Sequence, residues 1–173
     1  MQEDHTFEPL IFPDSKILIL GSFPSIKSLQ EGFYYAHPRN QFWPILSEIF
    51  HEKANSQEEK IALCKKHRIA LFDSAKSLQR ESGNSSDANL KNIEVNDFKK
   101  LLEEYPSIEM IAFTGKKAEQ IFNKKYKNLS IKKVLLPSTS PAHASMKFNE
   151  KLQKYKAILQ HANNDLISEN KTT

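Results

Sequence analysis

Four short apolar runs, each ending at a turn or polar residue, dominate the pattern of this chain. They lie at residues 16–20, 69–73, 108–113 and 134–136, with few polar positions inside them. Runs of this kind are typical of strands that are covered on both faces, as in parallel sheets. The pattern therefore predicts four buried strands that belong to one mostly parallel sheet.

Segments with helical spacing alternate with these runs. Phe42, Ile45 and Ile49 would share one face of a helix, and Pro44 is tolerated in its first turn. Further helices are expected over residues 57–67, from a cap at Asn96 or Asp97, around residues 118–122, and over residues 147–162. The alternation predicts an α/β fold, a single three-layer domain with helices on both faces of a central four-stranded sheet.

The remaining segments define the expected limits of this domain. We take residues 1–173 as one domain in which residues 1–15 form a loose N-terminal arm and residues 164–173 a loose tail. Residues 74–96 are polar and are expected to be irregular.

Ligands of such folds bind outside the carboxyl ends of the strands. The predicted ends are Gly21, Asp73, Gly115 and Pro137, and the loops after the first and last strands have the most unusual sequences of the chain. We therefore expect the site at this edge. Asp73 is interpreted first as a strand-end cap and second as a residue that faces the pocket.

Composition excludes several classes of protein. The chain has 173 residues, 39% of them hydrophobic, and a mean hydropathy of −0.58. It has no apolar run long enough to cross a membrane and no signal-peptide pattern. The single cysteine, Cys64, excludes a disulfide framework and a multi-cysteine metal site. We expect a cytoplasmic, non-secreted protein without membrane partners or a metal site.

Positive charge is concentrated in one part of the chain. The formal net charge is +4, but residues 114–156 contain eleven lysines and two glutamates, so this segment carries +9 and the rest −5. Any single lysine could simply solvate a helix face. Together they predict a surface that faces a polyanion such as nucleic acid.

The loop after the first strand carries candidate binding chemistry. Gly21 allows close approach of a ligand to the backbone, while Tyr34, Tyr35 and Asn40 offer stacking surfaces and hydrogen-bonding groups. The neighbouring aromatic residues at positions 42 and 43 are better explained as core. Asn40 could equally be a loop tie or a cap of the following helix.

Two loop sequences resemble a known family. Residues 32–43 read Gly-Phe-Tyr-Tyr-Ala-His-Pro-Arg-Asn-Gln-Phe-Trp and follow a strand that ends in Gly-Ser-Phe-Pro-Ser. This is similar to the uracil-DNA glycosylase superfamily, in particular its mismatch-specific and hypoxanthine-DNA glycosylase branches. Residues 136–143, Leu-Pro-Ser-Thr-Ser-Pro-Ala-His, resemble the second active-site motif of that family, and the likeness spans residues 17–145.

The resemblance implies a monofunctional DNA glycosylase of base-excision repair. Such an enzyme flips a deaminated base, here hypoxanthine first and uracil second, out of double-stranded DNA and hydrolyses its N-glycosidic bond without a cofactor. It also implies a monomer, downstream repair enzymes as partners and, in a bacterium, an association with the nucleoid.

Individual roles follow the same resemblance. Asn40 takes the catalytic position, where its amide would orient water and stabilise positive charge on the sugar, and Tyr35 takes the base-stacking position. The base pocket would comprise Gly21, Ser22, Phe23, Pro24, Tyr35, His37 and Thr114. The loop that binds DNA and inserts a wedge would comprise Ser138, Thr139, Ser140, Pro141, Ala142 and His143, with Lys116 and Lys147 beside it.

Three positions depart from the family pattern. Phe23 stands where most relatives carry a water-activating Asp or Asn, and Thr114 and His143 each replace an expected Asn. These departures leave a second hypothesis open, a catalytically weak or inactive nucleic-acid-binding relative. A nucleotide- or phosphate-handling enzyme is less favoured because the chain lacks Gly-x-x-x-x-Gly-Lys-Ser/Thr and Gly-x-Gly-x-x-Gly motifs.

Overall fold

The computed structural model describes residues 2–80, 90–142 and 145–171, with side chains as far as residue 160. Its elements follow in the order β1 (Gln2–Asp4), β2 (Ile17–Gly21), α1 (Ile26–Glu31), α2 (Phe42–Phe50), α3 (Gln57–Lys66), β3 (Ile69–Asp73), β4 (Ala75–Arg80), β5 (Leu90–Val95), α4 (Phe98–Glu104), β6 (Met110–Thr114), α5 (Lys116–Tyr126), β7 (Lys132–Leu136) and α6 (Phe148–Lys171).

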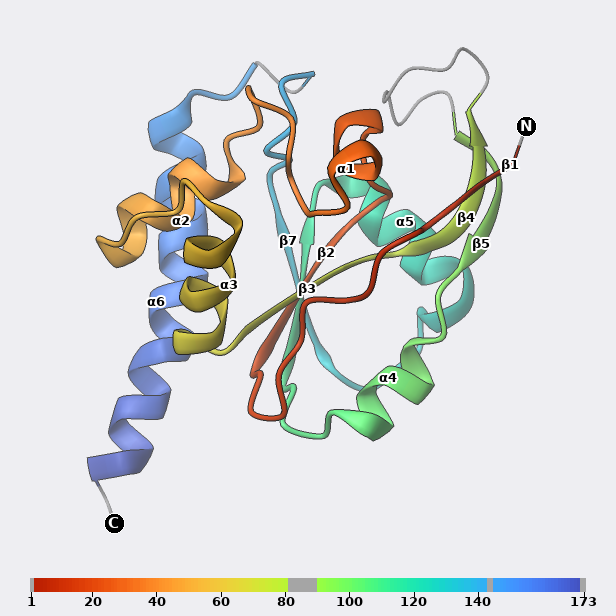
Figure 1. The fold of residues 1–173 in the computed structure, drawn as a ribbon. Helices are drawn as coiled ribbons and strands as arrows, with labels where there is room; N and C mark the ends of the chain where they lie inside the picture. The colour runs from red at the N-terminus through yellow and green to blue at the C-terminus, as the bar shows by residue number, and fades with distance from the viewer. Residues whose placement is uncertain (1, 81–89, 143–144, 172–173) are drawn as a thin grey trace.

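A four-stranded parallel sheet in the order β3-β2-β6-β7 forms the centre of the molecule (Figure 1). Strand β2 is buried along its whole length and pairs with β3 on one side and β6 on the other. The four predicted strands and their parallel arrangement are thus confirmed. An apolar run needs no alternation here because helices cover both faces of the sheet.

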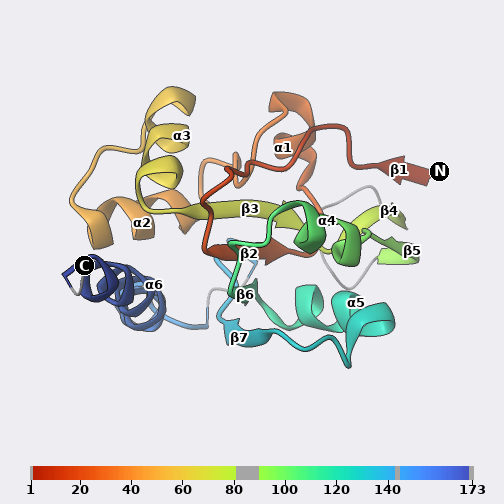
Figure 2. The same ribbon diagram turned by 90° about the horizontal axis from the view of Figure 1, so that it is seen from below.

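Alternate residues of β2 point to opposite layers of helices. Ile17 and Ile19 pack in a core cluster with residues of α2, α3 and α6. Leu18 and Leu20 pack in a second cluster with residues of α4 and α5. Figure 2 shows the two sets of helices around the sheet. The predicted three-layer α/β architecture is confirmed.

Two parts of the segment expected to be irregular, residues 75–80 and 90–95, form strands, and residues 81–89 lie outside the described residues. Strands β4 and β5 pair antiparallel, and β1 adds to β4 to form a second sheet in the order β1-β4-β5. Its buried residues Ala75, Leu78 and Leu90 pack on Ile121 of α5. The strands escaped notice because polar residues and two register shifts interrupt the alternation on which strand prediction depends.

The N-terminal arm is not loose either. After β1 it crosses the edge of the parallel sheet, where Leu10 and Leu71 exchange two backbone hydrogen bonds of 3.0 and 2.8 Å. The hydroxyl of Tyr34 also donates to the carbonyl of Glu8 at 3.0 Å. The arm therefore covers β3, which would otherwise be an open edge strand. At the other terminus, α6 continues to Lys171, beyond the expected end at residue 162.

Short-range capping sets several of the helix ends. Asp97 caps α4 by accepting from the Lys100 N–H at 3.0 Å, as one of the two predicted caps. Ser56 and Glu59 form a reciprocal capping box at the start of α3. Helix α1, absent from the sequence-based expectation, is only six residues long and begins at the cap Ser25.

Candidate active site

The carboxyl ends of the central strands bring separate parts of the chain together. Gly21 and Asp73 are paired in register on β2 and β3. A Cβ atom on Gly21 would lie 2.6 Å from Asp73 Oδ1, 3.4 Å from Tyr35 Oη and 3.6 Å from Thr114 Oγ1. Only a residue without a side chain fits between these polar groups, which explains the glycine at the end of β2.

Tyr35 is held rigidly at this edge. Its backbone has a φ of 53°, its ring stacks on Phe42 with centroids 3.9 Å apart, and its Oη lies 3.3 Å from Thr114 Oγ1. Thr114 Oγ1 donates to the Leu20 carbonyl at 3.3 Å, so the Tyr35 hydroxyl is the donor in the Tyr35–Thr114 bond. Burial, and then the charge of Asp73, raise the pKa of Tyr35. The phenol therefore stays protonated.

Hydrogen bonds to serine side chains hold the loop between β2 and α2 together. Ser28 Oγ accepts from the Ala36 N–H and from Ser25 Oγ, at 3.1 and 3.2 Å. The indole N–H of Trp43 donates to the Tyr34 carbonyl at 2.9 Å. Trp43 and Phe42 are buried, so their predicted role in the core is confirmed. Tyr34 is buried with them and has a packing role rather than an open stacking surface.

Asn40 lies at the end of a tight turn that positions its amide. The Asn40 N–H donates to the His37 carbonyl at 2.9 Å, and His37 Nδ1 accepts from the Arg39 N–H at 3.1 Å. Asn40 Oδ1 accepts from the Phe42 N–H at 2.9 Å, which caps the start of α2. An amide oxygen has two lone pairs. The cap uses one of them, so the cap and the predicted contact with water are compatible.

The second predicted loop lies directly against the first. Gln41 N–H donates to the Thr139 carbonyl at 3.0 Å, and Gly115 N–H donates to the Leu136 carbonyl at 2.8 Å. A Cβ atom on Gly115 would lie 3.2 Å from Ser138 Cβ. Figure 1 shows both loops at the same end of the sheet. The structure thus brings the Asn40 and Tyr35 loop together with residues 137–142.

Local hydrogen bonds shape the second loop. Ser138 Oγ accepts from the Ser140 N–H, and Ser140 Oγ accepts from the Ala142 N–H, each at 3.2 Å. Those N–H groups are therefore engaged, whereas the serine hydroxyl protons can still reach a phosphate. Thr139 is buried, and its contact with DNA stays a prediction. Pro141 is half-buried, Ala142 is exposed, and His143 lies outside the described residues.

Helix α6 binds the two loops through two hydrogen-bonding residues that the sequence analysis missed. The buried Lys151 Nζ donates to Gln41 Oε1 at 2.9 Å, and the buried Tyr155 Oη donates to the Pro137 carbonyl at 2.5 Å. Burial lowers the pKa of Lys151 and raises that of Tyr155. Their helical spacing with the apolar positions Leu152 and Leu159 could have revealed that both side chains point inward.

The short segment after Gly21 turns toward the second sheet. Phe23 packs on the buried cluster of β4, β5 and α5, and the Arg80 guanidinium lies 5.3 Å from its ring centroid. Arg80 Nη2 also donates to the Pro24 carbonyl. The Ala75 N–H donates to the Ser22 carbonyl at 3.0 Å. These three positions of the predicted base pocket thus link the two sheets, and their contact with a base stays a prediction.

The N-terminal arm supplies one more residue, a histidine that the sequence analysis did not assign to the site. His5 is buried, and its Nε2 lies 2.9 Å from Asp73 Oδ2. Asp73 is buried at the strand end with Oδ1 beside Gly21, and that it faces a pocket stays a prediction. No local sequence pattern links positions 5 and 73, because long-range pairing of the N-terminal arm with β4 and β3 brings them together.

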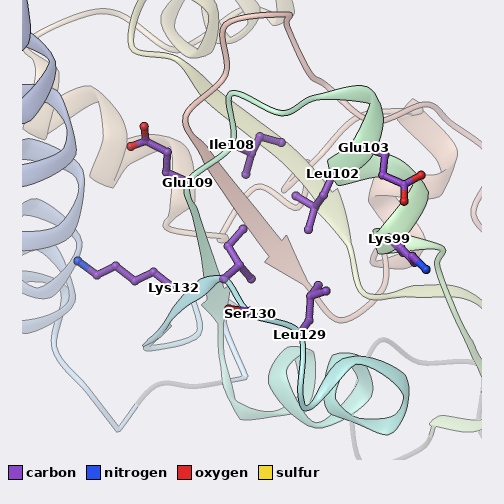
Figure 3. A pocket seen from close by; sticks show the side chains of 9 residues that line it. Lys99, Leu102, Glu103, Ile108, Glu109, Leu129, Ser130 and Lys132 are labelled. Atoms are coloured by element: carbon purple, nitrogen blue, oxygen red, sulfur yellow. The ribbon is translucent and has the colours of Figure 1, made fainter.

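Lysines of the basic segment do not share one face. Lys116 and Lys147 are exposed next to the two site loops, but Lys151 is buried. Lys132 lines a cavity of about 600 Å³ at the amino ends of β6 and β7 (Figure 3). That cavity, with Leu102 and Ile108 among its lining residues, lies at the opposite edge of the sheet from Gly21 and Asp73. The prediction of a single polyanion-facing side therefore fails for Lys132 and Lys151.

The described residues form neither a membrane-spanning helix nor a metal-binding cluster. Within residues 2–80, 90–142 and 145–171, no helix has the length and apolarity needed to cross a membrane. The same ranges contain no group of three or more His, Cys, Asp or Glu side chains placed to hold a metal ion.

The protein has an α/β fold with two adjoining loops at the carboxyl edge of its parallel sheet. One loop is aromatic, and the other is rich in serine and proline. The chain belongs to the uracil DNA glycosylase superfamily, whose family model matches residues 9–167.

Two relatives and one solved structure are similar to this chain over most of their length. The chain is 31% identical over 157 residues to a protein of Methanosarcina acetivorans named hypoxanthine DNA glycosylase, covering 90% of this chain and 97% of that one. It is 35% identical over 114 residues to a protein of the same name from Methanosarcina barkeri, covering 65% and 71%. A solution NMR structure of a candidate uracil DNA glycosylase from M. acetivorans superimposes with a TM-score of 0.79 at 30% identity, covering 94% of this chain and 99% of that one.

Proposed function

We propose that this protein is a DNA glycosylase that removes hypoxanthine, the deamination product of adenine, from double-stranded DNA. One observation carries the proposal. Tyr35, Asn40 and the loop of residues 137–142 come from distant parts of the chain and meet at the carboxyl edge of one sheet. Family membership and the relatives named hypoxanthine DNA glycosylase support the same activity.

The reaction makes modest chemical demands that this edge can meet. Water attacks C1′ of the sugar while the C1′–N9 bond breaks, and the bonding electrons leave with the base. In the net reaction the proton lost by the water ends on the base, which is released as neutral hypoxanthine. Positive charge develops on the sugar, and negative charge on the departing base. Asn40 would be the catalytic residue, because the free lone pair of Oδ1 can orient the water and stabilise the sugar cation.

The remaining site residues would bind the extruded nucleotide. The ring of Tyr35, rigid on Phe42, would support the base, with Gly21, Thr114 and His37 around it. The hydroxyls of Ser138 and Ser140 and the exposed Lys116 and Lys147 would contact phosphates. Pro141, Ala142 and His143 would fill the space that the base leaves in the duplex.

The proposal extends to the setting of the reaction. Residues 1–173 would act as one domain and as a monomer, in the cytoplasm and, if the cell is bacterial, at the nucleoid. The abasic product needs a downstream enzyme that cleaves the DNA backbone at an abasic site. Uracil would be a second, poorer substrate.

The test is an assay of base release. Purified protein is incubated with duplexes that contain inosine, uracil or a thymine mismatch at one position, the free base is measured, and alkali then cleaves abasic sites. The proposal expects hypoxanthine release and alkali-sensitive strands from the inosine duplex. If folded protein at low salt releases no base, the enzymatic proposal is wrong. Salt-sensitive DNA binding without release would then favour a binding protein.

A further inference from the structure

The buried pair of His5 and Asp73 has no part in the roles assigned above. Asp73 is 4% exposed, and its two oxygens face different surroundings. Oδ2 lies 2.9 Å from His5 Nε2, while Oδ1 faces Gly21, next to the Tyr35 hydroxyl. The charge of Asp73 contributes to the raised pKa of both Tyr34 and Tyr35. A carboxylate oxygen thus lies beside the aromatic residue that would support the base.

His5 is built into the fold in a way that serves Asp73. Its backbone N–H donates to the Lys76 carbonyl at 2.9 Å, which fixes the residue directly after β1. Its ring lies between Phe7 and Phe72, at centroid distances of 4.5 and 5.0 Å. Within the described part of the chain, the buried Nδ1 has no hydrogen-bond partner. Since a phenylalanine would pack here without that unsatisfied nitrogen, the contact with Asp73 explains the histidine.

We infer that the N-terminal strand completes the base-recognition site, with His5 as a positioning residue that holds Asp73 as the acceptor for a ring N–H of the extruded base. This inference rests on the proposed function. His5 Nε2–H engages Oδ2, so the carboxylate cannot rotate freely and Oδ1 keeps its orientation toward Gly21. The occupant that fits is a base with a ring N–H next to a carbonyl.

This arrangement distinguishes hypoxanthine from adenine by chemistry. Hypoxanthine carries a proton on N1, whereas N1 of adenine is a lone pair that would repel a carboxylate. A site that selects the deaminated base in this way would leave the far more abundant adenine untouched.

Substitution of Asp73 by asparagine gives the sharpest test. In Asp73→Asn the carbonyl oxygen would keep the bond from His5, which places the NH₂ group where Oδ1 now accepts. Single-turnover release is measured from duplexes that carry hypoxanthine or unsubstituted purine, whose N1 is an acceptor. We expect release of hypoxanthine to fall about 10- to 150-fold, and release of purine to fall much less or to rise. An equal fall for both bases, or no fall, overturns the inference.

A second pair of variants tests His5 and guards against a fold defect. His5→Phe keeps the ring and its burial but removes the donor, so we expect the ratio of hypoxanthine to purine release to fall. His5→Gln can place an N–H near the same point and should restore most of that ratio. Equal ratios in both variants and the wild type would contradict the positioning role even if Asp73→Asn failed to fold.

Two controls separate the possible failures. Glu103→Gln removes the same charge from an exposed side chain at the opposite edge of the sheet and should leave both rates unchanged. If the wild-type protein releases no hypoxanthine, the proposed function fails. If it does, and the base ratio of the Asp73 variant matches wild type, only the present inference fails.

Discussion

Gly21→Ala places a methyl group at the most crowded point of the site. The new Cβ would lie 2.6 Å from Asp73 Oδ1, whereas ordinary contact begins near 3.4 Å. The carboxylate must therefore move by about 0.8 Å, unless β2 itself shifts. Because β2 is buried between β3 and β6, the side chain of Asp73 is the part that can move.

The magnitude follows from the bond that this movement breaks. The contact between His5 Nε2 and Asp73 Oδ2 is 2.9 Å long, and a displacement of about 0.8 Å would carry it beyond hydrogen-bonding distance. A hydrogen bond that involves a charged group contributes about 1.5–3 kcal/mol. In a chain of this length each kcal/mol shifts the melting temperature by about 2–4 °C. We expect Gly21→Ala to melt about 3–12 °C below the wild type.

Thermal unfolding followed by circular dichroism measures this directly. Gly32→Asn is a suitable control, because a Cβ at Gly32 has no neighbour within 4 Å and asparagine tolerates its φ of 67°. The control should melt within about 2 °C of the wild type. A Gly21→Ala protein that melts with the wild type would refute the packing of Asp73 against β2.

Three further outcomes follow from the structure. Tyr155→Phe removes the donor to the Pro137 carbonyl and should lower the free energy of unfolding, measured in urea, by about 1 kcal/mol. An unchanged urea midpoint would argue against this hydrogen bond between α6 and the second loop. A hydrogen bond from Lys66 lowers the pKa of Glu52. The ionised group therefore stabilises the fold above the ordinary pKa of a glutamate and loses this effect as the pH falls through the lowered pKa. Glu52→Gln should therefore be less stable than the wild type at neutral pH, with a difference that shrinks below about pH 4; a constant difference across the pH range would contradict this. Lys147→Ala should weaken DNA binding and reduce the salt dependence by about one phosphate contact, and an unchanged slope would place Lys147 away from the DNA.

The sequence predicted the elements that depend on local pattern. The four buried strands, the helix from Phe42 and the cap at Asp97 each follow from apolar spacing or from a capping residue. The two loops of the candidate site were identified because each follows a predicted strand end. Their proximity could be inferred, since carboxyl ends of parallel strands share one edge.

Features that depend on long-range pairing escaped the sequence. The second sheet requires β1 to pair with β4 across more than seventy positions, and nothing in residues 2–4 indicates a partner. The approach of His5 to Asp73 is a consequence of that pairing. Burial of Lys151 was missed because a lysine is usually solvated, although its spacing with Tyr155 and Leu159 places it on the inward face of α6.

The central claim is that the carboxyl edge of the parallel sheet is a glycosylase site with Asn40 as its catalytic residue. Single-turnover release of hypoxanthine from an inosine duplex by Asn40→Ala tests it most directly, with duplex affinity and melting temperature measured on the same protein. Loss of the cap on α2 costs about 1 kcal/mol, so the variant should stay folded and bind DNA. We predict that its release rate falls at least about 100-fold. A folded variant that releases hypoxanthine at the wild-type rate would contradict this account.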